Sequence, residues 1–370
     1  MHEPPAHPHF PDSYAEGRSR FLRACRLADA EIQSHTHPSL YGPAGEALAI
    51  DSAWVGRPDA RNILFVSCGT HGLEAAAGAA TIVQWLETQG PASLSRSTAI
   101  LFVHAVNPYG WAYARRGNED GIDLNRNFID HSASLPHNAA YSELHSLIMK
   151  TSAAQLSLAE FSEDFQEFCA NRSNSYALNG ITSGQYQHQN GLSFGGLAPS
   201  WSRQILERIV RTYLVSTQKI LHIDWHTGIG PFSQPFFILD DTPSSEAYRL
   251  ASSWWPSHTI HCDDVVAGTS IKYHGLLSEG LKTELARHSP AHMISLTVEW
   301  GTYEVDRMLE ALVIDNWLAH RSSGSGPEFV HDAQERLKQL FCPSDTVWRQ
   351  SVLLKSQDIY RDALAALEAW

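Results

Sequence analysis

The chain has 370 residues, of which 43% are hydrophobic and 18% are charged. This composition supplies enough apolar material for a packed core and excludes both a disordered chain and a coiled coil. Because 27 Lys and Arg stand against 40 Asp and Glu, the formal net charge is −13, which argues against a nucleic-acid partner and against attachment to anionic membranes.

Short apolar segments followed by Gly, Asn, Asp or Pro predict buried strands. These segments are 62–67, 99–106, 220–225, 235–239 and 293–299. Apolar residues at helical spacing predict helices over 14–34, 74–89, 201–218, 244–255, 304–320 and 357–369. The alternation predicts an α/β fold with a mixed, mostly parallel central sheet and helices on both faces. In such folds ligands bind at the carboxyl ends of the strands.

Residues 131–200 interrupt this alternation and predict an insertion over one edge of the site. A helical part at 141–169 is followed by a polar, Gly-rich tail, and the insertion could be either a mobile lid or a static surface excursion. Residues 321–330 resemble a linker. We therefore expect one catalytic domain over 10–320 and a helical extension, 331–370, that packs on it.

The N-terminal segment and the cysteines favour a cytoplasmic location. The first residues have neither a basic start nor an apolar stretch of signal-peptide length, and no run approaches about 18 consecutive apolar residues. The five cysteines are far apart and include no CxxC pair, which favours reduced thiols over a disulfide framework. We expect a cytoplasmic protein that does not span a membrane.

A His and a Glu three residues apart, His71 and Glu74, follow the strand at 62–67. This spacing lets an imidazole nitrogen and a carboxylate meet on one cation at the start of a helix. Zinc accepts both ligand types but prefers about four ligands, so a further protein ligand is required. Without one, a polar turn with Glu74 at a helix N-terminus is the simpler interpretation.

The strand at 220–225 leads into the third candidate ligand, His226. In an extended segment His222, Asp224 and His226 share one face. His226 lies at the exit of the strand and is best placed to face a site there, and Asp224 could support a ligand. His222 lies deeper and is more simply interpreted as a hydrogen-bonded histidine of the core.

Glu299 ends the strand at 293–299. A buried Glu is costly unless it has partners. Its functional interpretation is a general base that takes a proton from a metal-activated water. Its structural interpretation is an ion pair or a cap for the helix that begins near residue 304.

The loop after the strand at 99–106 contains Asn125 and Arg126. An Asn-Arg pair in a loop past a strand end suits a planar, bidentate grip on a substrate carboxylate. In the same loop, Arg115 or Arg116 could stabilise an oxyanion in a tetrahedral transition state.

The simpler interpretation of a loop arginine is an ion pair with Asp120 or Asp123, which lie between Arg116 and Arg126 in the sequence. The residues of this loop leave both interpretations open.

Four motifs occur in a definite order: HGLE after a strand, an arginine-bearing loop leading to DLNRNF, a strand ending in DWHTG, and a strand ending in Glu. This order resembles the zinc metallocarboxypeptidases related to carboxypeptidase A. The segments SYAEGRSRF, VHAVNPYGWA, RRGNEDGIDLNRNF and VEWGTY look like a bacterial branch of that family. The resemblance extends over most of residues 10–320.

The resemblance implies that His71, Glu74 and His226 hold one zinc ion per chain, with a water in the open fourth position. It also implies that Glu299 is the general base and proton shuttle. The expected fold is accordingly that of a zinc carboxypeptidase.

The same resemblance implies that Asn125 and Arg126 hold the terminal carboxylate of the substrate. Tyr273 is a loose match to the mobile tyrosine that caps the substrate in the family. The transition-state arginine of the family is displaced by a few residues in this sequence, so both Arg115 and Arg116 remain candidates.

We therefore expect a zinc-dependent hydrolase, a metallocarboxypeptidase, that cleaves an amide bond next to a free carboxylate. One alternative is a deacylase of N-acyl amino acids, of the succinylglutamate desuccinylase and aspartoacylase type. Another is a non-catalytic protein that binds a peptide or small acid at its metal site. The sequence leaves open the preferred side chain, the oligomeric state and which divalent ion is native.

Overall fold

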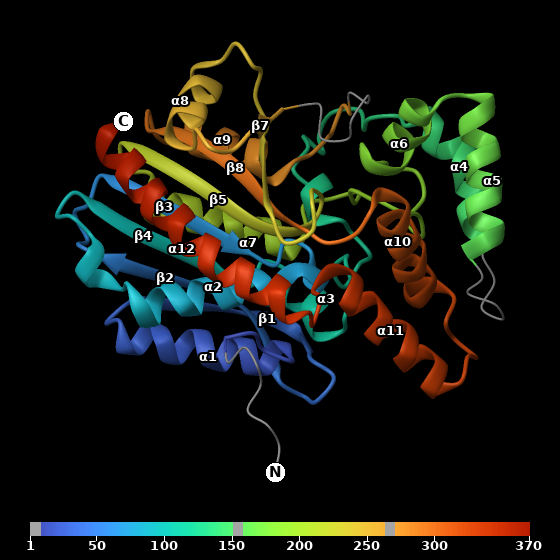
Figure 1. The fold of residues 1–370 in the computed structure, drawn as a ribbon, viewed down its shortest axis with the longest axis horizontal. Coiled ribbons are helices and arrows are strands. Elements are labelled where there is room, and N and C mark those ends of the chain that lie inside the picture. Colours follow the sequence, from blue (N-terminus) through green and yellow to red (C-terminus); the bar gives the residue numbers. More distant parts are fainter. Residues whose placement is uncertain (1–8, 151–157, 263–270) are drawn as a thin grey trace.

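The computed structural model describes residues 9–150, 158–262 and 271–370. In these residues eight strands form one sheet in the order β1-β2-β4-β3-β5-β8-β6-β7 (Figure 1). Their bounds are β1 (Glu31–Tyr41), β2 (Ala47–Gly56), β3 (Asn62–Cys68), β4 (Thr98–His104), β5 (Lys219–Gly228), β6 (Pro235–Leu239), β7 (Ile260–His261) and β8 (His292–Gly301).

The centre of the sheet is parallel. Strands β4, β3, β5 and β8 run in one direction, whereas β2 and β6 pair antiparallel on either side of them. The expected α/β fold with a mixed, mostly parallel sheet is confirmed, and each of the five predicted strands is present. The central strands read as nearly continuous apolar runs because helices cover both of their faces.

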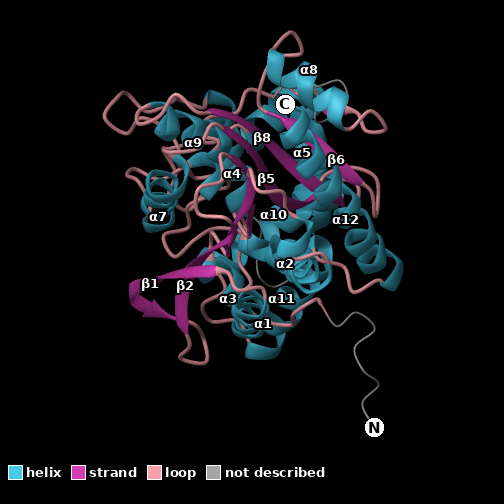
Figure 2. Cartoon of the chain, turned by 90° about the vertical axis from the view of Figure 1, so that its left-hand side faces the viewer, coloured by secondary structure: helices cyan, strands magenta, loops and turns pink. Residues whose placement is uncertain are grey.

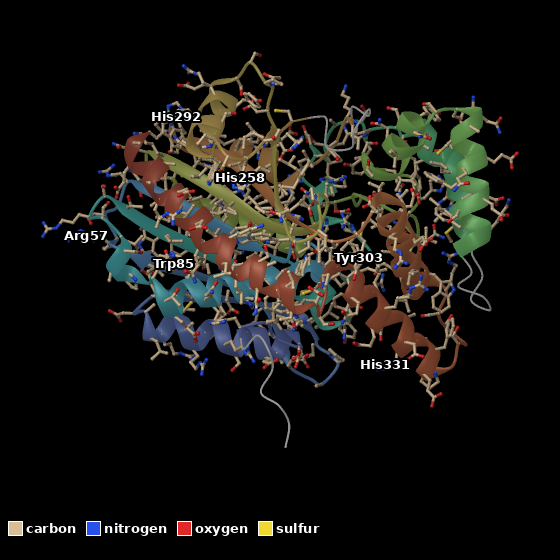
Figure 3. The ribbon with its side chains drawn as sticks, in the orientation of Figure 1. Arg57, Trp85, His258, His292, Tyr303 and His331 are labelled. Carbon is tan, nitrogen blue, oxygen red and sulfur yellow. The ribbon has the colours of Figure 1, made fainter. Side chains whose placement is uncertain are left out.

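Helices pack on the two faces in separate layers (Figure 2). One face carries α1 (Tyr14–Leu27), α2 (Ala75–Thr88) and α12 (Thr346–Ala369), and the other carries α7 (Trp201–Ile209) and α9 (Leu277–Ala286). Trp85 of α2, labelled in Figure 3, is fully buried. Its ring contacts those of Phe102 in the sheet and Tyr360 in α12. The extension at the C-terminus thus packs on the sheet through α12.

The remaining helices of the described residues lie at the ends of the sheet and beside it. They are α3 (Pro108–Ala112), α4 (Ala139–Lys150), α5 (Leu158–Asn171), α6 (Asn174–Thr182), α8 (Glu246–Trp254), α10 (Val305–His320) and α11 (Pro327–Phe341). Helices α4 to α6 belong to the predicted insertion, and they share a third apolar cluster with α10 and α11 (Figure 1). Residues 151–157 of its expected helical part lie outside the described residues.

Several expected boundaries are wrong. The helix expected over 14–34 ends at Leu27, and β1 begins at Glu31, because Asp29 adopts a φ of 53° that an α-helix does not tolerate. The helix expected over 201–218 changes from α to π geometry at Val210. The segment expected as a linker, 321–330, contains the start of α11, whose Pro327 follows Gly326.

No helix within the three described ranges is long and apolar enough to cross a membrane.

Candidate metal centre

The site lies where the carboxyl ends of β3, β5 and β8 meet. His71 follows the end of β3 by three residues, and His226 lies near the end of β5. Glu299 lies at the same level of β8, where it is the register partner of His226. Adjacent parallel strands place register partners side by side, so the order of the strands brings together residues that are far apart in the sequence.

Glycine lets the turn after β3 approach the neighbouring loop. A Cβ atom on Gly72 would lie 2.0 Å from the backbone of Gly110 in α3, so only glycine fits there. The Gly72 amide donates to the carbonyl of Arg116 at 3.3 Å. The 3₁₀ turn Gly72–Glu74 then carries Glu74 into the site, with His71 directly before it.

Three side chains converge as potential metal ligands. One ligand atom each of His71, Glu74 and His226 lies within 4.8 Å of the others, and all three side chains are buried. The Nδ1 atom of His71 is 2.9 Å from Glu74 Oε1, and the Nδ1 atom of His226 is 3.0 Å from Glu74 Oε2. The three residues proposed from the sequence as zinc ligands therefore form one cluster.

The Nε2 nitrogen of each imidazole contacts its own aspartate. His71 Nε2 lies 3.1 Å from Asp123 Oδ1, and His226 Nε2 lies 2.7 Å from Asp224 Oδ2. A carboxylate at one ring nitrogen keeps the proton there and leaves the other nitrogen as a lone-pair donor. Both Nδ1 atoms are thereby directed at the centre of the cluster.

The donor set fits zinc. His71 Nδ1 is buried and makes no hydrogen bond in the described residues, because its approach to Glu74 has the distance but not the direction of one. A buried nitrogen without a hydrogen bond is costly, and a metal ion would satisfy it. Two imidazoles and one carboxylate form the three-ligand set of catalytic zinc sites, which keep the fourth position open.

Glu299 lies beside this cluster with few polar partners. Its Oε2 accepts a long hydrogen bond, 3.4 Å, from the Ile229 amide. Burial, together with the negative charge of Glu74, raises the pKa of Glu299 to about 7. A carboxyl group with a pKa near neutrality can both take and return a proton at working pH.

The structure separates the two loop arginines. Arg116 donates from Nη1 to Glu74 Oε1 at 3.0 Å and lies 3.4 Å from Asp123 Oδ2, so it faces the cluster. Arg115 instead donates from Nε to Asp315 in α10 at 3.0 Å, and the structure does not bring it into the cluster. Asn107 fixes this loop, because its Nδ2 donates to the carbonyl of Arg116 at 3.1 Å.

The predicted carboxylate-binding residues lie together beyond Asp123. The Leu277 amide, at the start of α9, donates to Asn125 Oδ1 at 2.9 Å, which leaves Nδ2 as the donor of this side chain. Arg126 donates from Nε to the Thr182 carbonyl at 2.8 Å. The guanidinium of Arg126 lies 4.8 Å from the centre of the ring of Tyr273, the residue that loosely matches a substrate-capping tyrosine.

Charges in the site are balanced by close pairing. Burial alone would raise the pKa of Glu74, but His71 and His226 outweigh it and lower this pKa. Burial also opposes ionisation of Asp123, yet His71 and Arg116 hold its pKa well below the usual range. Both carboxylates are therefore ionised at neutral pH, as metal binding and histidine orientation require.

Asp123 is a candidate site residue that the sequence did not single out. From the sequence it was only a possible ion-pair partner of a loop arginine, and the structure shows that ion pair with Arg116 as well as its contact with His71. Its position directly before Leu-Asn-Arg was the available signal. His222 is the core histidine expected, since Ser67 and Ser295 contact its ring nitrogens at 2.9 and 2.7 Å.

Comparison with known proteins gives a family and distant structural likenesses. A family model described as "Protein of unknown function (DUF2817)" matches residues 10–355. No curated protein sequence matches the chain. Solved structures that match include carboxypeptidases.

Carboxypeptidase A from Helicoverpa armigera is 12% identical over 88% of this chain and 73% of its own, with a TM-score of 0.47. A metallo-carboxypeptidase from Burkholderia cenocepacia is 13% identical over 95% and 71%, with a TM-score of 0.45. A murein-tripeptide amidase from Escherichia coli O157 is 15% identical over 83% and 91%, with a TM-score of 0.40. These values describe a distant likeness of arrangement, from which no substrate follows.

Proposed function

The chain belongs to the DUF2817 family, and we propose that it is a zinc-dependent hydrolase that cleaves an amide bond next to a free carboxylate. The observation that carries this proposal is the cluster of His71, Glu74 and His226 with the buried carboxyl group of Glu299 on the adjacent strand. A structural metal site has no need for such a carboxyl group, because closed zinc sites take four protein ligands.

His71, Glu74 and His226 would hold the zinc, oriented by Asp123 and Asp224. The chemistry that zinc supplies in such a site is a lowered pKa of water, toward about 7, and polarisation of a carbonyl group. Glu299 would take the proton from the attacking water on its carboxylate and return it to the leaving amine. Arg116 would stabilise the negative charge that develops on the carbonyl oxygen.

Asn125 and Arg126 would bind the free carboxylate of the substrate. Arg126 supplies a planar cation, and Asn125 an amide donor, which together suit a bidentate grip on a carboxylate. Holding that carboxylate would place the neighbouring amide bond over the cluster.

Metal content and hydrolysis test the proposal together. We expect about one zinc per chain in the purified protein, as for other three-ligand sites, and loss of that zinc in His71→Ala. We also expect hydrolysis of peptides with a free C-terminus, and none of the same peptides when amidated. Zinc without hydrolysis of any peptide or N-acyl amino acid would leave a binding protein, and cleavage of N-acyl amino acids alone would make it a deacylase.

A further inference from the structure

The insertion makes three contacts with Arg126, one of the two residues that we assign to the substrate carboxylate. The Thr182 carbonyl, at the end of α6, accepts the Nε of Arg126 at 2.8 Å. The Tyr186 hydroxyl donates to the carbonyl of Arg126 at 2.7 Å. A Cβ atom on Gly184, whose φ is +98°, would lie 2.9 Å from Arg126 Cδ. The backbone at Gly184 therefore packs closely against the aliphatic part of the Arg126 side chain.

The same part of the insertion holds the segment that carries Tyr273. The Lys272 amide donates to Asn179 Oδ1 at 3.0 Å, and the His274 amide donates to the Ser183 carbonyl at 2.9 Å. The hydrogen bonds of the two backbone amides on either side of Tyr273 restrict its φ and ψ angles, and the ring lies against the guanidinium of Arg126. Residues 179–183 thus support both Arg126 and the segment of Tyr273.

Asn138 ties this support to the rest of the insertion. Its Nδ2 lies within hydrogen-bond distance of the Gly180 carbonyl, the Ser183 hydroxyl and the Gly184 carbonyl, at 2.9, 3.2 and 2.9 Å. Its Oδ1 accepts the Tyr141 amide at the start of α4 at 2.8 Å. One side chain therefore joins α4 to the turn at 180–184, whose carbonyls hold Arg126 and the Tyr273 segment.

We infer that the part of the insertion formed by the start of α4 and residues 174–186 is a fixed support that positions Arg126 and Tyr273 for the substrate carboxylate, and that Asn138 is its positioning residue. This inference rests on the proposed function. A support of this kind fixes the fork of the guanidinium before substrate arrives, which reduces the ordering cost of binding. It also assigns the insertion a role in selecting substrates with a free carboxylate.

The test compares Asn138→Ala with Glu143→Ala. Glu143 also joins parts of the insertion, through Arg172 and Tyr176, but it does not contact the turn at 180–184. We expect Asn138→Ala to raise KM for a free-carboxylate substrate roughly ten-fold, with kcat changed less than about two-fold, because the lost interaction is one of binding and orientation. Glu143→Ala should behave as wild type.

Hydrogen exchange gives a second measurement that does not need activity. The amides of Lys272 and His274 should exchange faster in Asn138→Ala and remain protected in Glu143→Ala, because only the first variant loosens their acceptors. If Asn138→Ala does not fold, both measurements are made on Asn179→Ala instead, because this substitution directly removes the acceptor of the Lys272 amide.

The two proposals fail in different ways. A wild-type protein that hydrolyses no substrate would contradict the proposed function. The positioning role of Asn138 would then be tested by hydrogen exchange of the Lys272 and His274 amides. Calorimetry would also compare the binding of an N-acetyl amino acid with the binding of the corresponding N-acetyl amino acid amide. The positioning role would be overturned if Asn138→Ala and Glu143→Ala had the same KM and the same rates of amide hydrogen exchange. Where there is no activity, the affinity for the N-acetyl amino acid takes the place of KM.

Discussion

His71 and His226 present the same ring nitrogen, Nδ1, to a single carboxylate. The two nitrogens lie 2.9 and 3.0 Å from the two oxygens of Glu74. Each imidazole adopts this orientation because its Nε2 is held by its own aspartate, Asp123 or Asp224. The symmetry of the pair means that each aspartate controls one ligand independently.

Removing the charge of Asp123 should weaken zinc binding without removing a ligand. In Asp123→Asn we expect the dissociation constant for zinc to rise roughly 10–100-fold, the usual effect of losing a carboxylate partner of a ligating histidine. Competition with a chelator of known affinity measures it. Asp120→Asn is the control, because Asp120 is exposed in the same loop. Equal affinity in the two variants would contradict the assignment.

Glu299→Gln should abolish turnover while zinc remains bound. The amide keeps the shape of the side chain but cannot take a proton, so we expect kcat to fall at least about a hundred-fold. Metal analysis of the same sample should still give the wild-type zinc content. Glu304→Gln, at an exposed position just beyond β8, serves as the control. Loss of zinc from Glu299→Gln would mean that Glu299 acts as a ligand rather than as a base.

The two arginines in the loop should differ in kind. Arg116→Ala should lower kcat by about 10²–10³-fold, as for removal of one group that stabilises an oxyanion. Arg115→Ala should leave kcat near wild type and lower thermal stability, because it loses only its ion pair with Asp315. Steady-state kinetics and thermal unfolding of both variants measure these effects. A larger loss of kcat in Arg115→Ala would reverse the assignment.

The sequence predicted the parts of the fold whose signal is local. Strands β3, β4, β5, β6 and β8 are apolar and short, and their ends are marked by glycine and polar residues. Strands β1, β2 and the two-residue β7 were not predicted. β1 is largely exposed and polar, and β2 carries a fully buried Asp51, whose charge is balanced by Arg18 in α1 at 2.7 Å. A partner 33 residues away cannot be read from a strand's own pattern.

The same limit applies to the site. The order of the motifs pointed to His71, Glu74 and His226, because each lies next to a strand end. The choice between Arg115 and Arg116 depended on Asp315, which is 200 residues distant in the sequence. Sequence spacing gives no information about such a contact. The role of the insertion likewise depends on hydrogen bonds between residues that are 42 to 93 positions apart.

Buried neutral histidines should make the fold sensitive to acid. His104 is fully buried, stacks on Phe21 at 4.6 Å, and neither ring nitrogen has a hydrogen-bond partner in the described part of the chain. Burial lowers the pKa of His104 to about 4, from 6.5 in the unfolded chain. As pH falls below 6.5, the unfolded chain therefore binds this proton first, and stability is lost until pH reaches about 4.

Replacing His104 should remove that share of the acid sensitivity. The shift corresponds to about 3 kcal/mol of unfolding free energy. In His104→Leu, the fall in the free energy of unfolding between pH 7 and pH 4 should be smaller than in wild type by up to that amount, as measured by denaturant titration at each pH. His292→Leu, which removes an exposed imidazole at the start of β8 (Figure 3), is the control. Part of the acid sensitivity should persist in His104→Leu, because burial also lowers the pKa of His222 to about 4. Equal pH dependence in His104→Leu and His292→Leu would show that His104 is not a source of acid lability.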